Sequence, residues 1–237
     1  MTRLIVDTRD LRQALAAVGP HMGSPRLQPE LARVHCRVEG PNLVVTATNT
    51  VSAALAIVSV LENEHGEASV FDLYPTELAD LLGGFKASDP KEELGDTLRV
   101  EETDVPQPSL RITDVSGLWP GKSLTLPRDA VMGNAFPDIG ASLATLLRQA
   151  EMRMPHVGDV VANGGMLGLF GKAARSYGCP LIVEVTGDRS PVLVIACGES
   201  FVGFLATIVP SEDAALEQKR WRSAWFDRLT PFADAGE

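Results

Sequence analysis

The same order of apolar patterns occurs three times along the chain: a short strand, an amphipathic helix and three more strands. The strands expected in the first copy are 4–6, 32–38, 43–48 and 53–61, and its helix starts at Asp7 or Thr8. Those expected in the second are 69–73, 97–101, 109–113 and 123–126, with a helix that opens at Pro75. Those expected in the third are 159–162, 181–186, 192–197 and 201–209, with a helix over 164–177. Such a chain must pack its helices on one side of antiparallel sheets, so the pattern predicts an α+β fold.

Two segments do not fit the repeat. The first contains Phe-Pro-Asp-Ile at 136–139 and a helical pattern over 142–152. The second is a tail that places Trp221, Trp225 and Leu229 on one face of an amphipathic helix, which either docks on the body or binds a partner. We therefore divide the chain into two half-units at 1–127, a linker at 128–156, a half-unit completing a second domain at 157–210, and the tail at 211–237.

The negative charge is concentrated in one stretch. The 237 residues carry 31 acidic and 21 basic side chains, a formal net charge of −10. Residues 62–104 hold 13 acidic and 3 basic residues, which accounts for a net −10 by itself. The rest of the chain can present a local basic face to phosphates, so the overall charge does not exclude nucleic-acid binding.

The sequence gives no sign of export or membrane insertion. The charged N-terminal decapeptide leaves no room for the apolar core of a signal peptide. The most apolar window, 192–209, is interrupted by Gly-Glu-Ser at 198–200 and is typical of a hairpin. Three scattered cysteines, Cys36, Cys179 and Cys197, do not make a disulfide framework. We expect a cytoplasmic protein that does not enter a membrane.

Recognised catalytic motifs are missing from the sequence. Residues 116–123 read Ser-Gly-Leu-Trp-Pro-Gly-Lys-Ser, which resembles a phosphate loop, but Ser116 replaces its first glycine and a strand is expected to follow. The four histidines, His21, His35, His65 and His156, stand apart from one another. We expect no catalytic residue, metal site or cofactor. A metal-dependent hydrolase that uses the acidic stretch is a third hypothesis, which calorimetry with magnesium and manganese would test.

Basic side chains recur on the expected helices. They could hold duplex phosphates without reading base sequence, which gives weak and strongly salt-dependent binding. Ordinary solvent-exposed helix cations would produce the same pattern, so both interpretations stay open. The candidate DNA-binding residues are Arg9, Arg12, Lys86, Arg148, Arg153, Lys172 and Arg175.

Several stretches resemble the DNA sliding clamps, in particular the bacterial DNA polymerase III beta subunit. Residues 11–50 resemble the opening helix and first strands of a clamp domain, including a strand that ends in Ala-Thr and an amide residue at 47–49. Residues 71–85 and 161–175 resemble the second helix of such a domain. Residues 189–210 resemble its closing hairpin.

Two smaller features belong to the same resemblance. Val209 and Pro210 occupy the place of a methionine-proline pair beside the partner-peptide cleft of clamps, and Phe-Pro-Asp-Ile resembles the segment that closes a clamp domain. In contrast, Thr50, Val51 and Ser52 replace the Gly-His-Arg that often lies near the cleft. The chain also has three clear units where a bacterial clamp has six.

The resemblance implies a noncatalytic processivity factor that encircles or rides on duplex DNA and tethers a polymerase or repair protein. The implied partner-peptide cleft comprises Phe136, Pro137, Ile139, Thr207, Val209 and Pro210. A clamp loader is a further partner that the resemblance allows. The alternative is a clamp-derived interaction module that regulates replication proteins without encircling DNA. Because clamp rings contain twelve units, a homo-oligomeric ring needs three copies if the linker is a degenerate fourth unit, and four copies if it is not.

Overall fold

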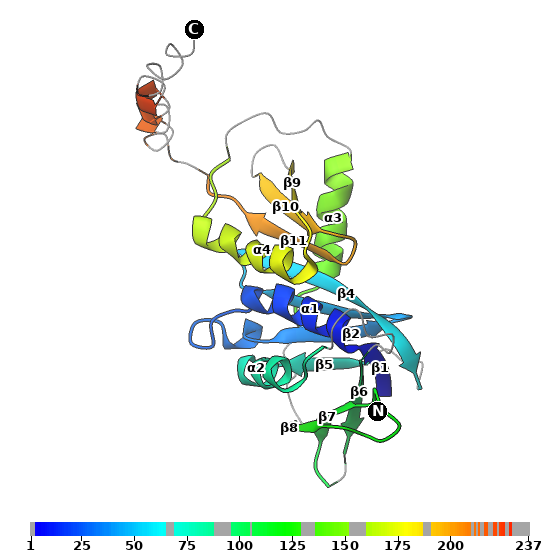
Figure 1. Ribbon diagram of the computed structural model, residues 1–237. Helices are drawn as coiled ribbons and strands as arrows, with labels where there is room; N and C mark the ends of the chain where they lie inside the picture. The colour runs from blue at the N-terminus through cyan, green and yellow to red at the C-terminus, as the bar shows by residue number, and fades with distance from the viewer. Residues whose placement is uncertain are drawn as a thin grey trace.

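The computed structural model in Figure 1 describes most of the chain. The described residues are 3–64, 69–87, 96–104, 106–128, 136–151, 160–186, 191–209 and scattered positions between 211 and 228. The helices are α1 (Thr8–Val18), α2 (Pro75–Gly84), α3 (Ile139–Glu151) and α4 (Gly164–Tyr177). The strands are β1 (Arg3–Asp7), β2 (Val34–Glu39), β3 (Asn42–Thr48), β4 (Ser52–Asn63), β5 (Val70–Leu73), β6 (Thr97–Thr103), β7 (Ser109–Asp114), β8 (Ser123–Pro127), β9 (Leu181–Thr186), β10 (Val192–Cys197) and β11 (Phe201–Ala206).

The first two units share one sheet, in which they exchange strands. The strand order is β5-β2-β3-β4-β1-β6-β7-β8, and the neighbouring pairs are antiparallel. The first strand of each unit therefore pairs with the second strand of the other, as β1 with β6 and β5 with β2. Neither unit is complete without the other.

The third unit joins this sheet through β4. Within its twelve residues, β4 pairs with β3 along one edge, and its other edge is divided between β11 and β1. Residues Ser52 to Ala56 face β11, whereas Val60 to Asn63 face β1. A change of register between Ile5 and Val6 marks the second contact. The strand β4 thus connects the third unit to the first, whereas the second unit is joined through β1 and β2.

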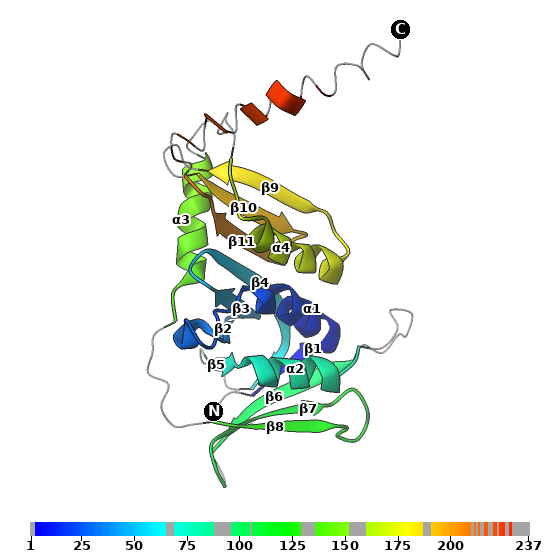
Figure 2. The ribbon, with the colours of Figure 1, turned by 90° about the vertical axis from the view of Figure 1, so that its left-hand side faces the viewer.

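Three helices form a layer on one side of the strands. Figure 2 shows α4, α1 and α2 side by side, and α1 contacts both of the others. Helix α3 lies away from this layer, against β3, β4 and β9. The arrangement confirms the α+β fold, with α1, α2 and α4 on one face of antiparallel sheets and α3 outside their layer.

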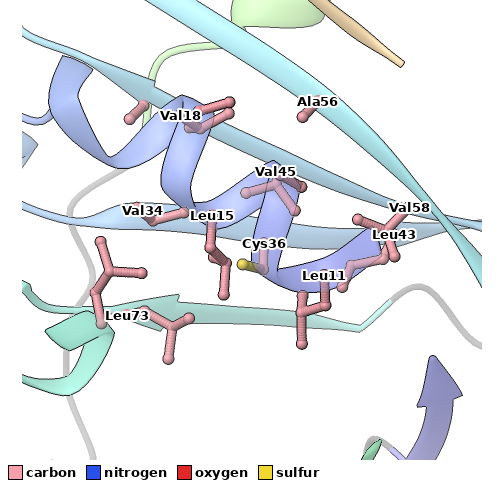
Figure 3. Packing of buried hydrophobic residues seen from close by; sticks show 14 of the residues in the cluster. Leu11, Leu15, Val18, Val34, Cys36, Leu43, Val45, Ala56, Val58 and Leu73 are labelled. Atoms are coloured by element: carbon pink, nitrogen blue, oxygen red, sulfur yellow. The ribbon is translucent and has the colours of Figure 1, made fainter. Parts of the chain in front are cut away.

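The main core lies between α1 and the sheet. Leu11, Leu15 and Val18 repeat at helical spacing on one face of α1, and all three are buried. Figure 3 shows them against alternate residues of the strands. These strand residues are Val34, Cys36, Leu43, Val45, Ala56, Val58 and Leu73. The apolar face of α1, with its helical spacing, thus packs against the inward-facing alternate residues of the strands in one cluster.

The junction between β4 and β11 is packed very closely. A Cβ atom on Gly203 would lie 2.4 Å from the Ala53 carbonyl oxygen and 2.8 Å from Cε1 of Phe170. His21 is buried on the same junction, where its Nδ1 lies 3.0 Å from the Ser52 hydroxyl and its ring centroid 4.5 Å from that of Phe170. Burial of the imidazole lowers the pKa of His21 to about 4, because the charged form loses its hydration.

Some boundaries differ from those expected from the sequence. Helix α3 starts at Ile139 rather than at 142, because the Asp138 side chain accepts a hydrogen bond from the Ala141 N–H at 2.8 Å and so caps it. The expected strand at 159–162 is reduced, among its described residues, to one bridge between Val161 and Ile208. Strand β11 ends at Ala206 rather than at 209. Cys36, Cys179 and Cys197 are free thiols in the structure.

We expect Gly203→Ala to lower the free energy of unfolding by about 1–3 kcal/mol, because the added methyl group overpacks the β4–β11 junction. The matched control is Gly168→Ala in α4, where a Cβ meets no described atom within 4 Å. That substitution should raise stability by about 0.5–1 kcal/mol through the loss of glycine's backbone freedom. Urea unfolding of both variants checks the prediction, which equal effects would contradict.

The junction should also weaken in acid. In the unfolded chain His21 takes up a proton near pH 6.5, whereas in the fold it does so only at about 4. Stability from this group is therefore complete above pH 6.5 and is lost as the pH falls toward 4, by about 3 kcal/mol in total. Urea titrations between pH 7.5 and 4 should show a smaller loss for His21→Gln, which cannot titrate. An identical loss in both proteins would contradict this account.

Candidate functional site

The face of the helix layer carries the first candidate site. Lys172 and Arg175 are exposed one turn apart on α4, and both line a cavity of about 410 Å³ between α1, α2 and α4. Leu15 and Pro20 line the same cavity from α1 and the turn after it, and Leu82 lines it from α2. Asn163 caps α4 by accepting hydrogen bonds from the N–H groups of residues 165 and 166, which fixes where the helix starts.

Two other cations at this layer are engaged within the fold. The Arg12 guanidinium donates hydrogen bonds to the carbonyl oxygens of Leu82 and Phe85, at the C-terminal end of α2. Lys122 donates to the Gly84 carbonyl at 3.2 Å. The last carbonyls of a helix lack partners within it and attract positive charge. Both side chains therefore hold α2 in place. The sequence of α2 did not predict this role, because Arg12 and Lys122 lie outside that helix.

The remaining candidate cations are dispersed. Arg9 is partly exposed in the first turn of α1, and Lys86 is exposed just after α2. Arg148 is exposed on α3, which Figure 2 shows away from the helix layer, so it does not join the others. Arg153 lies outside the described residues.

Acidic side chains interrupt the same layer. Asp10 and Asp80 are exposed on α1 and α2. Partial burial, with a smaller contribution from Asp7, raises the pKa of Asp10. The layer is consequently a mixed surface with a local cationic pair at Lys172 and Arg175, rather than a uniformly basic face.

A groove on the other side of the strands is the second candidate site. Its volume is about 200 Å³, and apolar side chains from β3, β4 and the segment before α3 form much of its wall. Three of the six predicted cleft residues line it: Phe136, Pro137 and Ile139. Ile139 is buried against Ala53, which anchors this side of the groove to β4.

A cluster of Arg33, His35 and Asp72 contacts Phe136 in the wall of the groove. The Phe136 ring stacks on the ring of His35 with centroids 4.8 Å apart, and the Cζ of Arg33 lies 5.6 Å from the Phe136 centroid. Asp72 contacts both side chains: its Oδ1 is 2.8 Å from His35 Nδ1 and its Oδ2 is 3.4 Å from Arg33 Nε. Arg33 is buried, so this ion pair is shielded from solvent. No local sequence signal marks this cluster, because its members come from β5, β2, the residue before β2 and the segment before α3.

The other predicted cleft residues lie elsewhere. Thr207 follows β11 and donates its hydroxyl proton to the Pro191 carbonyl. Val209 is 66% exposed beyond the bridge of Ile208 to Val161, and neither Thr207 nor Val209 lines the groove. Pro210 lies outside the described residues. The described structure does not bring the two halves of the predicted cleft together in this pocket.

The rejected phosphate loop occupies the turn between β7 and β8, so a strand follows it, as expected. Its Leu118 and Trp119 side chains are exposed. In the described part of the chain no three His, Cys, Asp or Glu side chains are grouped so that they could hold a metal ion. None of the described helices combines the length and apolar character needed to cross a bilayer.

The fold is similar to that of solved DNA sliding clamps. The DNA polymerase III beta subunit of Thermotoga maritima matches 89% of this chain and 65% of its own length, with a TM-score of 0.58 and 12% identity. A Bartonella birtlesii sliding clamp matches 89% of this chain and 66% of its own, with a TM-score of 0.57 and 14% identity. The Helicobacter pylori beta clamp bound to a DNA ligase peptide matches 89% of this chain and 68% of its own length, with a TM-score of 0.55 and 13% identity.

These likenesses confirm the clamp fold that the sequence patterns suggested. The chain spans just under two thirds of the Thermotoga protein's length. Neither a protein-family model nor a curated protein matches the sequence.

We expect Arg12→Ala to lower the free energy of unfolding by about 2 kcal/mol, because the carbonyl oxygens at the end of α2 lose a charged donor. Lys172→Ala, in the same layer, is the matched control and should change stability by less than about 0.5 kcal/mol. Chemical unfolding of both variants measures the difference. A neutral Arg12→Ala substitution would show that its contacts with α2 do not stabilise the fold.

Proposed function

We propose that this chain, which has the DNA sliding-clamp fold, is a noncatalytic processivity factor that acts on duplex DNA as a homo-oligomer. The single observation that carries the proposal is the layer formed by α1, α2 and α4, in which Lys172 and Arg175 of α4 are exposed and line a cavity shared by the three helices. Helix-borne cations can hold phosphates without reading base sequence, as a protein that moves along DNA requires.

The mechanism would be tethering. A protein that stays on the template raises the effective concentration of any enzyme bound to it, so a weak contact supports many catalytic cycles. The sparse cations suit this role, because movement along the duplex requires weak phosphate contacts. Retention would then depend mainly on the assembled protein surrounding the DNA.

The partner would be a polymerase or repair protein that presents a short peptide. One solved protein of this fold, from Helicobacter pylori, is bound to a DNA ligase peptide. In this chain, the groove at Phe136 and Ile139 offers apolar side chains that an apolar peptide side chain could contact. Arg37 and Glu39 at the groove wall would add polar contacts to the peptide. A clamp loader would be needed if the assembly is closed before it meets circular DNA.

One observation favours the alternative, a clamp-derived interaction module that does not encircle DNA. Arg12 and Lys122 are used to cap α2, which reduces the cations that face outward from the layer. Such a module would bind its partner through the groove and would not be retained on DNA. The same experiment separates the two functions.

The experiment measures retention on circular and linearised DNA after the mass in solution has been determined by light scattering. A ring should stay on circular DNA and leave linear DNA through its ends. The double variant Lys172→Glu with Arg175→Glu should lose retention, and removing two phosphate contacts should reduce the slope of binding against salt by about 2.

Arg111→Glu is the control, because Arg111 is exposed on the side of β7 opposite to the buried Leu110 and Ile112. It is compared with Lys172→Glu alone, which changes the net charge by the same amount. Equal retention of both single variants and of the double variant would contradict the assignment of the helix layer to DNA. A wild-type protein that stays on neither DNA would favour the interaction module.

A further inference from the structure

The third unit is built like the first. In the first, β1 leads to the N-cap Asp7 and then to α1, and Val6 pairs with Val60 near the end of the unit's last strand. In the third, Val161 leads to the N-cap Asn163 and then to α4, and it pairs with Ile208 just beyond β11. The strands β9, β10 and β11 then correspond to β2, β3 and β4.

The first two units show which strand pairing such a unit makes at the sheet edge that its own strands leave unpaired, called its open side below. Each gives its second strand to the first strand of the other, so that β6 pairs with β1 and β2 pairs with β5. The register of the first contact aligns the N-cap Asp7 with Thr97, the first residue of β6. The two contacts together make one continuous sheet of eight strands from two units that are each incomplete.

The third unit has this open side but lacks an equivalent neighbour among the described residues. There, β9 pairs with β10 alone, and Figure 2 shows it at the far end of the strands β9, β10 and β11. Ile182 and Val183 of β9 are 58% and 50% exposed, although they point to opposite faces of the strand. An exposed, apolar edge strand without proline or lysine is a template for pairing with another strand.

We infer that two copies of this chain pair through their third units, around a two-fold axis. In this contact β9 of each copy adds to the segment around Val161 of the other, as β6 adds to β1 within the first domain. Aligning Asn163 with Leu181, as Asp7 aligns with Thr97, places Val161 of one copy opposite Val183 of the second. The two contacts are equivalent by symmetry, which is typical of a dimer interface.

The chemistry of the two surfaces is compatible with this pairing. The segment 160–162 reads Val-Val-Ala, and the proposed register places the uncharged Val160 opposite Glu184. Val160 and Ala162 already pack against the main core, which holds the segment in an orientation fixed by the fold. Pairing would cover part of the apolar side chains at positions 182 and 183 and give the first half of β9 backbone hydrogen-bond partners on its open edge.

This inference deepens the proposed function and rests on it for its biological meaning. A dimer of this kind contains six units, arranged as two complete domains with a shared third domain between them. Two such dimers supply the twelve units that the resemblance requires of a ring. The inference therefore favours four copies over three.

The test compares the mass in solution of the full chain with that of Ile182→Lys and Val183→Lys, since lysine on an edge strand opposes pairing. The wild-type protein should form a dimer or a tetramer, and each variant should halve that mass, with a dissociation constant at least tenfold higher. Val70→Lys is the matched control, because Val70 is a strand residue of similar exposure, 47%, on β5; its mass should not change. A wild-type monomer at every concentration, a trimer, or variants of unchanged mass would overturn the inference.

A second measurement guards against misfolding of the lysine variants. The double variant Val161→Cys with Val183→Cys should form disulfides between copies on mild oxidation, because the proposed register places these residues opposite each other. The control, Val70→Cys with Val161→Cys, should not form them. The inference would be overturned if the double variant has the mass in solution and the circular dichroism of the wild-type protein but does not cross-link.

Retention on DNA keeps this inference separate from the proposed function. If the β9 variants keep both their mass and their retention, the interface is wrong while the function stands. If the wild-type dimer is broken by Val183→Lys but is never retained on DNA, the interface stands and the function is wrong.

Discussion

The hydrogen bonding of β4 is the interaction on which the rest of this structure depends. One edge of the strand is satisfied by β3, and the other is shared by β11 and β1. A strand can serve two neighbours along one edge only if it is long enough, and β4 is the longest described strand. The position of α4 beside α1, and with it the cavity at Lys172 and Arg175, follows from this shared strand.

The helix layer must satisfy its own ends before it can bind a ligand. Arg12 illustrates this competition, because its guanidinium already donates to the last carbonyls of α2. Lys172 and Arg175 stand on a helix whose C-terminal turn ends at a glycine, Gly178, with a positive φ of 65°. That cap needs no basic side chain, so these two cations are left to face outward. The local chemistry of helix ends thus decides which cations of the layer are available to phosphates.

Much of the fold could be predicted from the sequence because strand and helix periodicities are local signals. The helix at 164–177 and the strands at 181–186 and 192–197 were located to the residue. The candidate sites were harder to predict from the sequence, because they depend on pairing between strands that are distant in the chain. Phe136 stacks on His35 because the segment before α3 lies beside β2, which also pairs with β5. These contacts join residues far apart in the chain, so no short stretch of sequence predicts them. The predicted cleft stays a prediction: of its described residues, Phe136, Pro137 and Ile139 line the groove, whereas Thr207 and Val209 follow β11 and do not.

The junction between β4 and β11 also constrains the order in which the chain can fold. It pairs Ala56 with Phe201, residues about 145 positions apart, whereas most other strands pair within their own hairpin or with the adjacent unit. Contacts of such long range form late, since closing the intervening loop costs more entropy. During synthesis the first two units can complete their shared core while residues 52–56 still present an unpaired edge. Until β11 emerges, that edge is the part of the nascent protein most exposed to mispairing, and the close approach at Gly203 restricts which strand can finally occupy it.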